Sequence, residues 1–464
     1  MSSGHVRPST TPLLNYLPPE LLSEIFLKFV ASDPDNQRKL VTILSLVCSN
    51  WYKVASSTPQ LWTKFMYTSW GKAPSRHVSK WLKHFSTRKC DSLPFELILE
   101  SDYYTWPKIN EVLSIASSTA TTLNLYLRRS AAMLALFNPI QFAGIKSSLG
   151  PQPLISWDRL EKLTVTLHVE GTRSCGALWP PRHIQNPETE VMAPMPRLTH
   201  LSLQSFTRSN GPLATLTFPW AQLVSLEIGQ YLSEPEGILR VLQRCSALED
   251  CRLHLYGVRW WQFILGEGHL SLPRLRRLAV LADAWYDHDH LFEWILAPLF
   301  APALEYLELR IGNLGKWADL GDILNFIRRS GVNLRHLVLQ NVQVAEDMLT
   351  SFLSSAELQS LEILTVLNVL PQLVSFLEYG AQNPGVLPHL QVLDLTLSQC
   401  RHHFDLREAF DQFVAARVPE SHLSEGCSNG DGCDECSQVS LKKWWLEPCV
   451  HVGWLDGCGN WRIV

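Results

Sequence analysis

The stretch Leu304-Glu305-Tyr306-Leu307-Glu308-Leu309 decides the fold. It has the form Leu-x-x-Leu-x-Leu, in which apolar and polar residues alternate as they do along a strand with one buried face. Further copies recur along the chain, and from Leu198 onward they start 25 to 30 residues apart. Such a period is typical of a solenoid whose repeats each add one strand and one helix or turn. The copies start at Leu160, Leu198, Leu223, Leu248, Leu275, Leu304, Leu334, Leu361 and Leu390.

Between these copies, apolar residues recur at helical spacing, most clearly over 238–242, 323–327 and 348–353. Helices with this spacing can pack their apolar side behind the strands. Weaker alternation at 95–99 and 123–127 predicts that the strands begin before Leu160, and 171–196 reads as a Pro-rich insertion. The repeats resemble degenerate leucine-rich repeats, because their lengths vary and the consensus Asn is missing. The expected class is an α+β / α/β solenoid with parallel strands on its concave face and helices on its convex face.

The N-terminal part of the chain has the period of helices. Pro18 and Pro19 precede a wide apolar stripe over 21–29, which predicts a helix that starts at the prolines. A second apolar stretch runs over 40–55 and ends before Pro59. About three short helices are expected, and a domain this small buries too little surface to cover all their large apolar groups. A partner helix could cover the remainder.

Three segments of this region, 17–26, 44–51 and 58–62, together resemble an F-box-like domain of the kind common in fungi. In that family, the Leu-Pro pair and the apolar residues after it dock on a Skp-type adaptor, which joins a cullin and a RING subunit. The resemblance implies that the chain is a substrate-recognition subunit of an SCF-type cullin-RING ubiquitin ligase, not an enzyme. The implied adaptor-binding residues are Leu17, Pro18, Leu21, Leu22, Ile25, Phe26, Leu44, Val47, Cys48 and Trp51.

The surface expected to bind a protein substrate lies on the strands of the solenoid. Alternate residues of a strand point to opposite faces, so the residues between the buried leucines point outward. Curved repeat arrays offer long surfaces of this kind to partners. The resulting polar and aromatic face suits protein recognition, and our substrate-binding candidates are Arg252, Tyr306, Glu308, Arg310 and His336.

Composition favours a protein partner over nucleic acid or a membrane. The 464 residues carry 40 Lys plus Arg against 44 Asp plus Glu, so no broad positive field draws in polyanions. The basic connector after the F-box-like segment reads as the solvated face of an amphipathic helix. No secretory signal or membrane span is recognisable, and the odd number of 11 cysteines favours a reducing compartment, cytoplasmic or nuclear.

Motifs for catalysis or metal binding are sparse. We find no phosphate-binding loop, nucleophile elbow or metalloprotease helix, and residues 287–290 read as a solvated loop. Cys433 and Cys436 have zinc-knuckle spacing, and Cys449 with Cys458 or His451 could complete four ligands. A second Cys-x-x-Cys is lacking, so we expect no metal and no cofactor.

The expected domains are a disordered N-terminus at 1–12, the F-box-like domain at 13–65, a helical connector at 66–95, the repeat solenoid at 96–420 and a Cys/Trp-rich cap at 421–464. The alternative function is a scaffold or protein-binding repeat module that takes no part in ubiquitin transfer. A metal-dependent enzyme that uses the tail is a third possibility.

Overall fold

A computed structural model of the chain describes residues 17–33, 36–69, 78–88, 92–101, 106–127, 157–167, 194–206, 218–231, 235–256, 269–283, 293–311, 320–340, 346–367, 372–397, 403–416, 443–448, 454–455 and 461–462. The chain divides into two compact units. The first unit is Met1–Ser205 with Thr217–Pro219, and the second is Phe206–Leu216 with Trp220–Val464. The N-terminal segment expected at 1–12 lies outside the described residues, and so does most of the C-terminal cap expected at 421–464.

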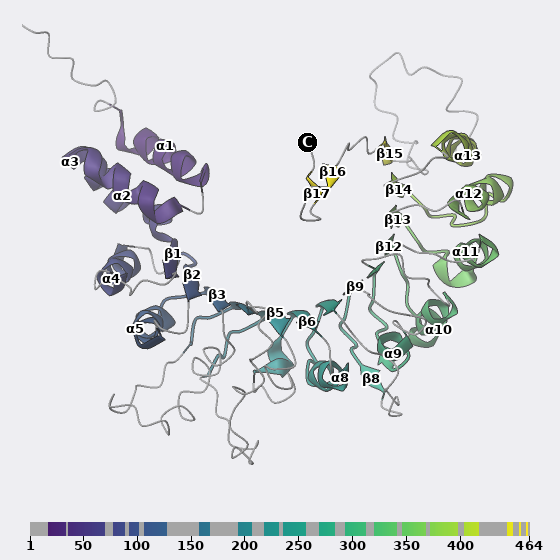
Figure 1. Ribbon diagram of the computed structural model, residues 1–464, viewed down its shortest axis with the longest axis horizontal. Coiled ribbons are helices and arrows are strands. Elements are labelled where there is room, and N and C mark those ends of the chain that lie inside the picture. Colours follow the sequence, from purple (N-terminus) through teal and green to yellow (C-terminus); the bar gives the residue numbers. More distant parts are fainter. Residues whose placement is uncertain are drawn as a thin grey trace, which may run out of the picture. The chain divides into compact units, whose positions relative to one another are not determined.

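The first unit begins with three helices and a short 3-10 turn (Figure 1). Pro19 opens the first helix, where its missing N–H costs nothing, and the side chain of Cys48 accepts a hydrogen bond from the Trp51 N–H at the start of the third. Apolar residues such as Leu22 and Phe26 are fully buried between the helices. The elements are α1 (Pro19–Ala31), α2 (Gln37–Val47), α3 (Ser49–Ser57) and η3 (Pro59–Trp62).

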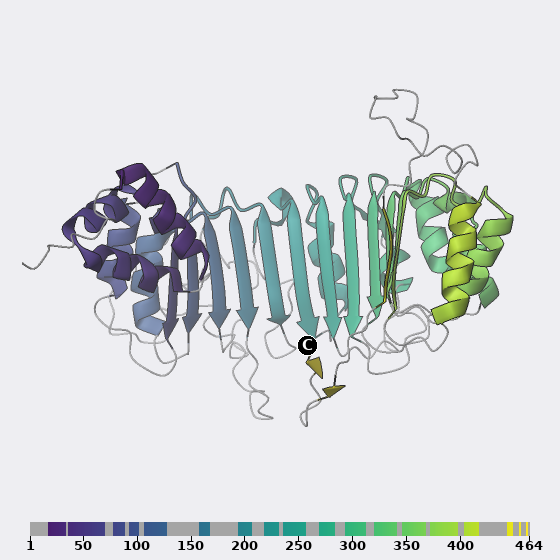
Figure 2. The ribbon, with the colours of Figure 1, turned by 90° about the horizontal axis from the view of Figure 1, so that it is seen from above.

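Five parallel strands follow in the first unit, side by side in chain order (Figure 2). They confirm that strands begin before Leu160. Sequence reasoning did not expect the first strand, which overlaps the start of the helical connector expected at 66–95. In this strand Phe65 and Tyr67 are buried and alternate with more exposed residues. The elements are β1 (Lys64–Ser69), α4 (Val78–Arg88), β2 (Glu96–Ser101), α5 (Trp106–Ser117), β3 (Thr122–Leu127), β4 (Lys162–Leu167) and β5 (His200–Phe206).

The second unit contains further parallel strands of the 13-stranded sheet, and Figure 1 shows helices along one face of these strands. Its strands are β6 (Ser225–Tyr231), β7 (Asp250–Tyr256), β9 (Arg277–Asp283), β11 (Tyr306–Ile311), β12 (His336–Gln340), β13 (Ile363–Leu367), β14 (Val392–Leu397) and β15 (Lys443–Pro448). Its helices are α8 (Pro235–Gln243), α9 (Glu293–Leu296), α10 (Gly321–Ser330), α11 (Glu346–Leu353), α12 (Gln372–Gln382) and α13 (His403–Ala415). Smaller elements are η8 (Trp220–Gln222), η10 (Ala356–Leu358), the parallel pair β8 (Leu270–Ser271) and β10 (Leu299–Phe300), and the antiparallel pair β16 (Trp454–Leu455) and β17 (Trp461–Arg462).

In the second unit, the register of the paired strands places leucines of neighbouring strands opposite one another. Leu307 lies opposite Leu278 on one side and Leu337 on the other, and all three are buried. Leu309 continues a second buried row two residues along. The expected helix residues, among them Ile323 and Phe352, are buried as well. A helical N-terminal region followed by parallel strands and helices in a solenoid-like repeat region confirms the fold class.

A row of alternating charge precedes β7, β9, β11, β12 and β13 of the second unit. The backbone N–H of each residue in this row donates to the carbonyl of the equivalent residue one strand earlier, at 2.8–3.0 Å. The side chains therefore sit one strand apart, roughly 4.8 Å. Opposite charges at that spacing attract, and Arg335 Nε lies 3.7 Å from Glu362 Oε1. The row is Glu249, Arg276, Glu305, Arg335 and Glu362.

We predict opposite effects of alanine at two glycines of the second unit. Gly331 ends α10 in the left-handed region (φ 61°), where a Cβ is strained, so Gly331→Ala should lower the free energy of unfolding by about 1 kcal/mol. Gly237 lies within α8, and nothing lies within 4 Å of an added Cβ. Gly237→Ala should stabilise by about 0.5–1 kcal/mol. Chemical denaturation measures both, and equal signs would contradict the assigned backbone conformation.

Candidate functional site

The first helix has two apolar faces. Leu22, Phe26 and Val30 are buried against the other helices. Leu21, Ile25 and Phe29 recur every four residues on another side, and they are 50%, 45% and 43% exposed. Residues at this spacing lie one above another along a helix, so the three form a continuous apolar stripe.

The second and third helices also expose large apolar side chains. Ile43, Leu46 and Val47 of α2 and Tyr52 of α3 are exposed, Leu46 most of all at 78%. Single exposed apolar residues are common on protein surfaces, but this many on three neighbouring short helices are typical of a protein interaction site. We call these residues the exposed apolar set: Leu21, Ile25, Phe29, Ile43, Leu46, Val47 and Tyr52.

The structure divides the ten residues expected to bind an adaptor. Pro18, Leu21, Ile25 and Val47 are exposed, and Leu17, Cys48 and Trp51 are half-buried. Contact with a partner stays a prediction for all ten, and Leu22, Phe26 and Leu44 are buried core residues. These three hold the helices together, as the 4.9 Å between the ring centroids of Phe26 and Trp51 shows. Sequence reasoning missed Phe29, Ile43, Leu46 and Tyr52 as exposed candidates, although Phe29 follows Ile25 by four residues.

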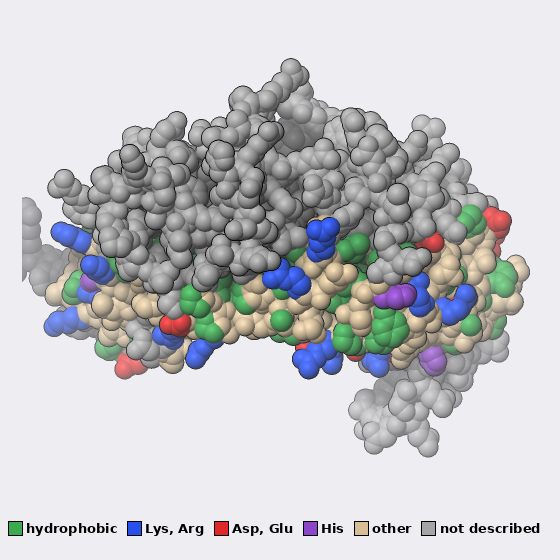
Figure 3. All heavy atoms as spheres, turned by 90° about the horizontal axis from the view of Figure 1, so that it is seen from below, with side chains coloured by type: hydrophobic (Ala, Val, Ile, Leu, Met, Phe, Trp, Pro, Cys, Tyr) green, Lys and Arg blue, Asp and Glu red, His purple; other side chains and the backbone are tan. Residues whose placement is uncertain are grey.

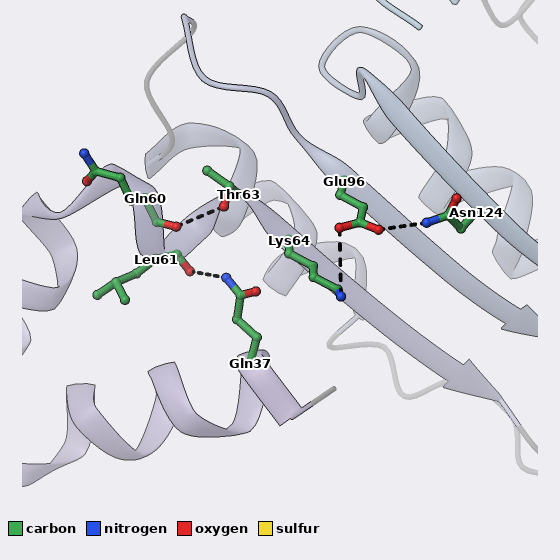
Figure 4. A network of polar contacts seen from close by, with 7 residues as sticks. All are labelled: Gln37, Gln60, Leu61, Thr63, Lys64, Glu96 and Asn124. Carbon is green, nitrogen blue, oxygen red and sulfur yellow. Dashed lines mark hydrogen bonds and ion pairs between the residues drawn. The ribbon is translucent and has the colours of Figure 1, made fainter. Parts of the chain in front are cut away.

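Polar contacts join α2 to η3 and the first strands to one another (Figure 4). Gln37 Nε2 of α2 donates to the Leu61 carbonyl at 3.0 Å. Lys64 Nζ of β1 lies 3.9 Å from Glu96 Oε2 of β2, whose other oxygen accepts from Asn124 Nδ2 of β3 at 2.8 Å. These contacts therefore hold α2 against η3 and link β1, β2 and β3 in series.

An aromatic cluster joins η3, β1 and α4. The ring of Phe85 from α4 lies 4.8 Å from Trp62 and 5.2 Å from Phe65, and all three are buried. Trp62 Nε1 also donates to the Ala55 carbonyl at 2.8 Å. Residues on both sides of position 65 thus form one core, so the helical bundle does not end at a packing boundary there.

A family model described as F-box-like matches residues 14–68, the segment that holds α1, α2, α3 and η3. This segment is an F-box-like domain. The match confirms the resemblance of this segment to an F-box-like domain. The exposed apolar set lies entirely within it.

Two further comparisons concern the whole chain. No curated protein matches it. A solved structure titled "Crystal structure of Rad7 and Elc1 complex in yeast" aligns over 83% of this chain and 91% of that one, with 16% identity and a TM-score of 0.35. A likeness this loose supports neither a shared function nor a shared partner.

On the second unit, four of the five substrate-binding candidates meet on adjacent strands. The Tyr306 hydroxyl donates to Glu308 Oε2 at 2.5 Å, and Glu308 also pairs with Arg310. The His336 ring stands edge-on to Tyr306, with 4.6 Å between centroids. These residues flank buried leucines and point to the sheet face opposite the helices, as the period-2 pattern predicts. We call Tyr306, Glu308, Arg310 and His336 the polar cluster.

The fifth candidate lies two strands away. Arg252 of β7 and Glu308 of β11 both pair in register with Ala279 of β9, so only a small side chain separates them. Arg252 Nε is 3.7 Å from Asp250 Oδ1. Sequence reasoning missed Arg277, which pairs in register with Tyr306, and Gln340 of the same face pairs in register with Arg310.

The polar cluster shifts the ionisation of two of its members. Burial raises the pKa of Tyr306, and the neighbouring Glu308 carboxylate raises it further. Burial is the largest cause of the lowered pKa of His336. The negative charge of Glu308 opposes this effect, and the positive charge of Arg277 adds to it. Both side chains are therefore neutral near pH 7. A neutral tyrosine and a neutral histidine beside two arginines can donate and accept hydrogen bonds to a partner.

Metal binding and membrane insertion have no support in the described residues. No group of three or more His, Cys, Asp or Glu among them could hold a metal ion, and no described helix could span a bilayer. The loop 287–290 and the cysteines from Cys427 to Cys458 lie outside the described residues. Cys245 and Cys251 are buried free thiols, and burial raises the pKa of Cys245 to about 12.

We predict that the two neighbours of His336 move its pKa in opposite directions. Arg277→Gln removes a positive charge that disfavours the imidazolium, so the pKa of His336 should rise. Glu308→Gln removes a negative charge that favours the imidazolium, so the pKa should fall further below 6.5. NMR titration of the His336 ring in the full chain measures both shifts. Parallel shifts would place His336 away from these two residues.

Proposed function

We propose that this chain is a non-catalytic substrate-recognition subunit of an SCF-type cullin-RING ubiquitin ligase. Its F-box-like domain would bind a Skp-type adaptor and, through it, a cullin and a RING subunit. Its repeat region would hold a protein target for ubiquitin-dependent degradation in the cytoplasm or nucleus. The observation that carries the proposal is the exposed apolar set within a segment that matches an F-box-like family.

The exposed apolar set supports the adaptor half of the proposal. Full burial of one large apolar side chain contributes about 1.5–3 kcal/mol, so several such residues can anchor an interface. Leu21, Ile25 and Phe29 form the stripe that an apolar partner groove or helix would cover. Leu22 and Phe26, which are buried, support the stripe from below.

The polar face of the repeats supports the target half. Tyr and Arg are frequent interface anchors, because the first offers rigid apolar area and the second offers forked donors. The pairing of Glu308 with both Tyr306 and Arg310 orients these side chains before a target arrives. A target held there would meet the ligase at a high effective concentration, which is how a subunit without catalytic groups accelerates ubiquitin transfer.

The first test concerns the adaptor. We predict that Leu21→Arg with Ile25→Arg abolishes binding of the full chain to a Skp-type adaptor, since a lost buried anchor costs about 2 kcal/mol or more. Calorimetry with purified adaptor measures the affinity, and thermal melting should stay close to that of the wild type because both residues are exposed.

A matched control replaces two exposed apolar residues outside the F-box-like domain by arginine. Phe300→Arg with Tyr379→Arg replaces two residues that are 39% and 40% exposed in the second unit, and it should leave adaptor binding intact. Unchanged binding by the Leu21 and Ile25 variant would reject the adaptor role. The full chain is needed, because a fragment ending at 65 would uncover Trp62 and Phe65.

The second test concerns the target. We predict that single alanines at Arg252, Tyr306, Glu308, Arg310 and His336 weaken capture of ubiquitinated targets by affinity purification and mass spectrometry. Tyr306→Ala and Arg252→Ala should do so while melting changes little, because neither lies in the core. Leu307→Ala, by contrast, should destabilise by about 2–5 kcal/mol. Full capture by all five variants would remove this face from target binding.

A further inference from the structure

A second surface of the first unit combines positive charge with exposed aromatic rings. Helices α3 and α4, Ser49-Asn-Trp-Tyr-Lys-Val-Ala-Ser-Ser57 and Val78-Ser-Lys-Trp-Leu-Lys-His-Phe-Ser-Thr-Arg88, contain no Asp or Glu. Lys53, Lys80 and Lys83 are exposed, as are Tyr52 and Trp81. With Arg88, these residues make up what we call the basic-aromatic surface.

Direct contacts join the two helices at this surface. Arg88 donates from Nη1 to Ser56 Oγ at 2.6 Å and from Nη2 to the Tyr52 hydroxyl at 2.8 Å. Its guanidinium lies 5.2 Å from the ring centroid of Tyr52 and 4.9 Å from that of Trp62, both within cation–π range. Arg88 is therefore held in place by neutral groups, and its charge is not cancelled.

His84 extends the surface along α4. Its ring lies 5.4 Å from Trp62 and 6.0 Å from Trp81. Lys80, His84 and Arg88 follow at intervals of four residues and so share one face of the helix. Burial lowers the pKa of His84, and the charge of Arg88 lowers it further, so the ring is neutral near pH 7.

The cations of this surface are not neutralised by any described carboxylate. Among the residues that the structure describes, Lys53, Lys80, Lys83 and Arg88 form no ion pair with a carboxylate. The chain as a whole carries a net charge of -4, so four positive groups gathered without an acid are a local exception. Figure 3 shows Lys and Arg side chains at its left end, with Asp and Glu side chains nearby.

We propose that the basic-aromatic surface docks an acidic protein segment that also carries aromatic or large apolar residues. Carboxylates would pair with Lys53, Lys80, Lys83 and Arg88, and apolar side chains would lie on Trp81 and Tyr52. Nucleic acid fits less well, because strong electrostatic binding to it commonly uses about 6–10 phosphate contacts. The proposal is independent of the adaptor and target roles, since it uses another set of residues except for Tyr52.

The test is fluorescence anisotropy with the full chain and a labelled peptide of four Glu-Glu-Phe repeats. We expect Lys80→Glu with Lys83→Glu to weaken binding about tenfold or more, because like charges then face each other. Trp81→Ala should weaken it to a smaller extent. Binding should also fall between about 0.1 M and 1 M salt, where the Debye length shortens from about 10 Å to 3 Å.

Controls separate this surface from general charge and from the adaptor interface. Arg197→Glu with Arg274→Glu makes the same charge change at exposed positions outside α3 and α4, and it should bind the peptide like the wild type. Leu21→Arg with Ile25→Arg should also retain peptide binding, whatever its effect on the adaptor. Circular dichroism checks that each variant is folded.

Several outcomes would overturn the proposal. Equal binding of a peptide with Gln in place of Glu would show that charge is not recognised. Equal loss in the Arg197 and Arg274 variant would show that only net charge matters. A single-stranded oligonucleotide that binds where the acidic peptide does not would assign the surface to nucleic acid instead.

Discussion

The stacking of one buried leucine on the next across paired parallel strands is the contact on which the repeat region depends. Leu278, Leu307, Leu337 and Leu364 follow one another in register, and each is almost completely buried. A shift of one residue would turn these side chains to the opposite face, so burial of the leucines specifies the register. This register also places the polar cluster, because the residues between two buried leucines of a strand point to the opposite face of the sheet.

In the F-box-like domain, large apolar side chains are divided between the core and the surface. Its helices are too short to enclose every apolar side chain, so α1 buries Leu22 and Phe26 and leaves Leu21 and Ile25 in water. Trp62, Phe65 and Phe85 then form a core that crosses from the helices to β1. The exposed stripe and the first strands of this unit are therefore parts of one packed body, and a partner bound at the stripe is held in a defined position relative to those strands.

Much of this architecture could be predicted from the sequence, for physical reasons that also explain the failures. Leu-x-x-Leu-x-Leu repeated at a nearly constant period leaves little choice of element or face. The first strand was missed because Phe65 and Tyr67 provide only two alternations, next to a strongly helical connector. Which of Leu21 and Leu22 is buried depends on where α2 and α3 pack, and a wide apolar stripe in one helix contains no such information. The hydrogen bond from Tyr306 to Glu308 depends on rotamers, and period-2 reasoning reaches only as far as the face on which both lie.

The row Glu249, Arg276, Glu305, Arg335 and Glu362 has a consequence for how such a chain can change in length. Loss of the single repeat that contains Arg276 would bring Glu249 beside Glu305, and two like charges one strand apart repel. Loss of two consecutive repeats would restore a Glu next to an Arg. The alternating charges therefore favour gain or loss of repeats in pairs in this part of the chain, because an even number keeps each Glu next to an Arg.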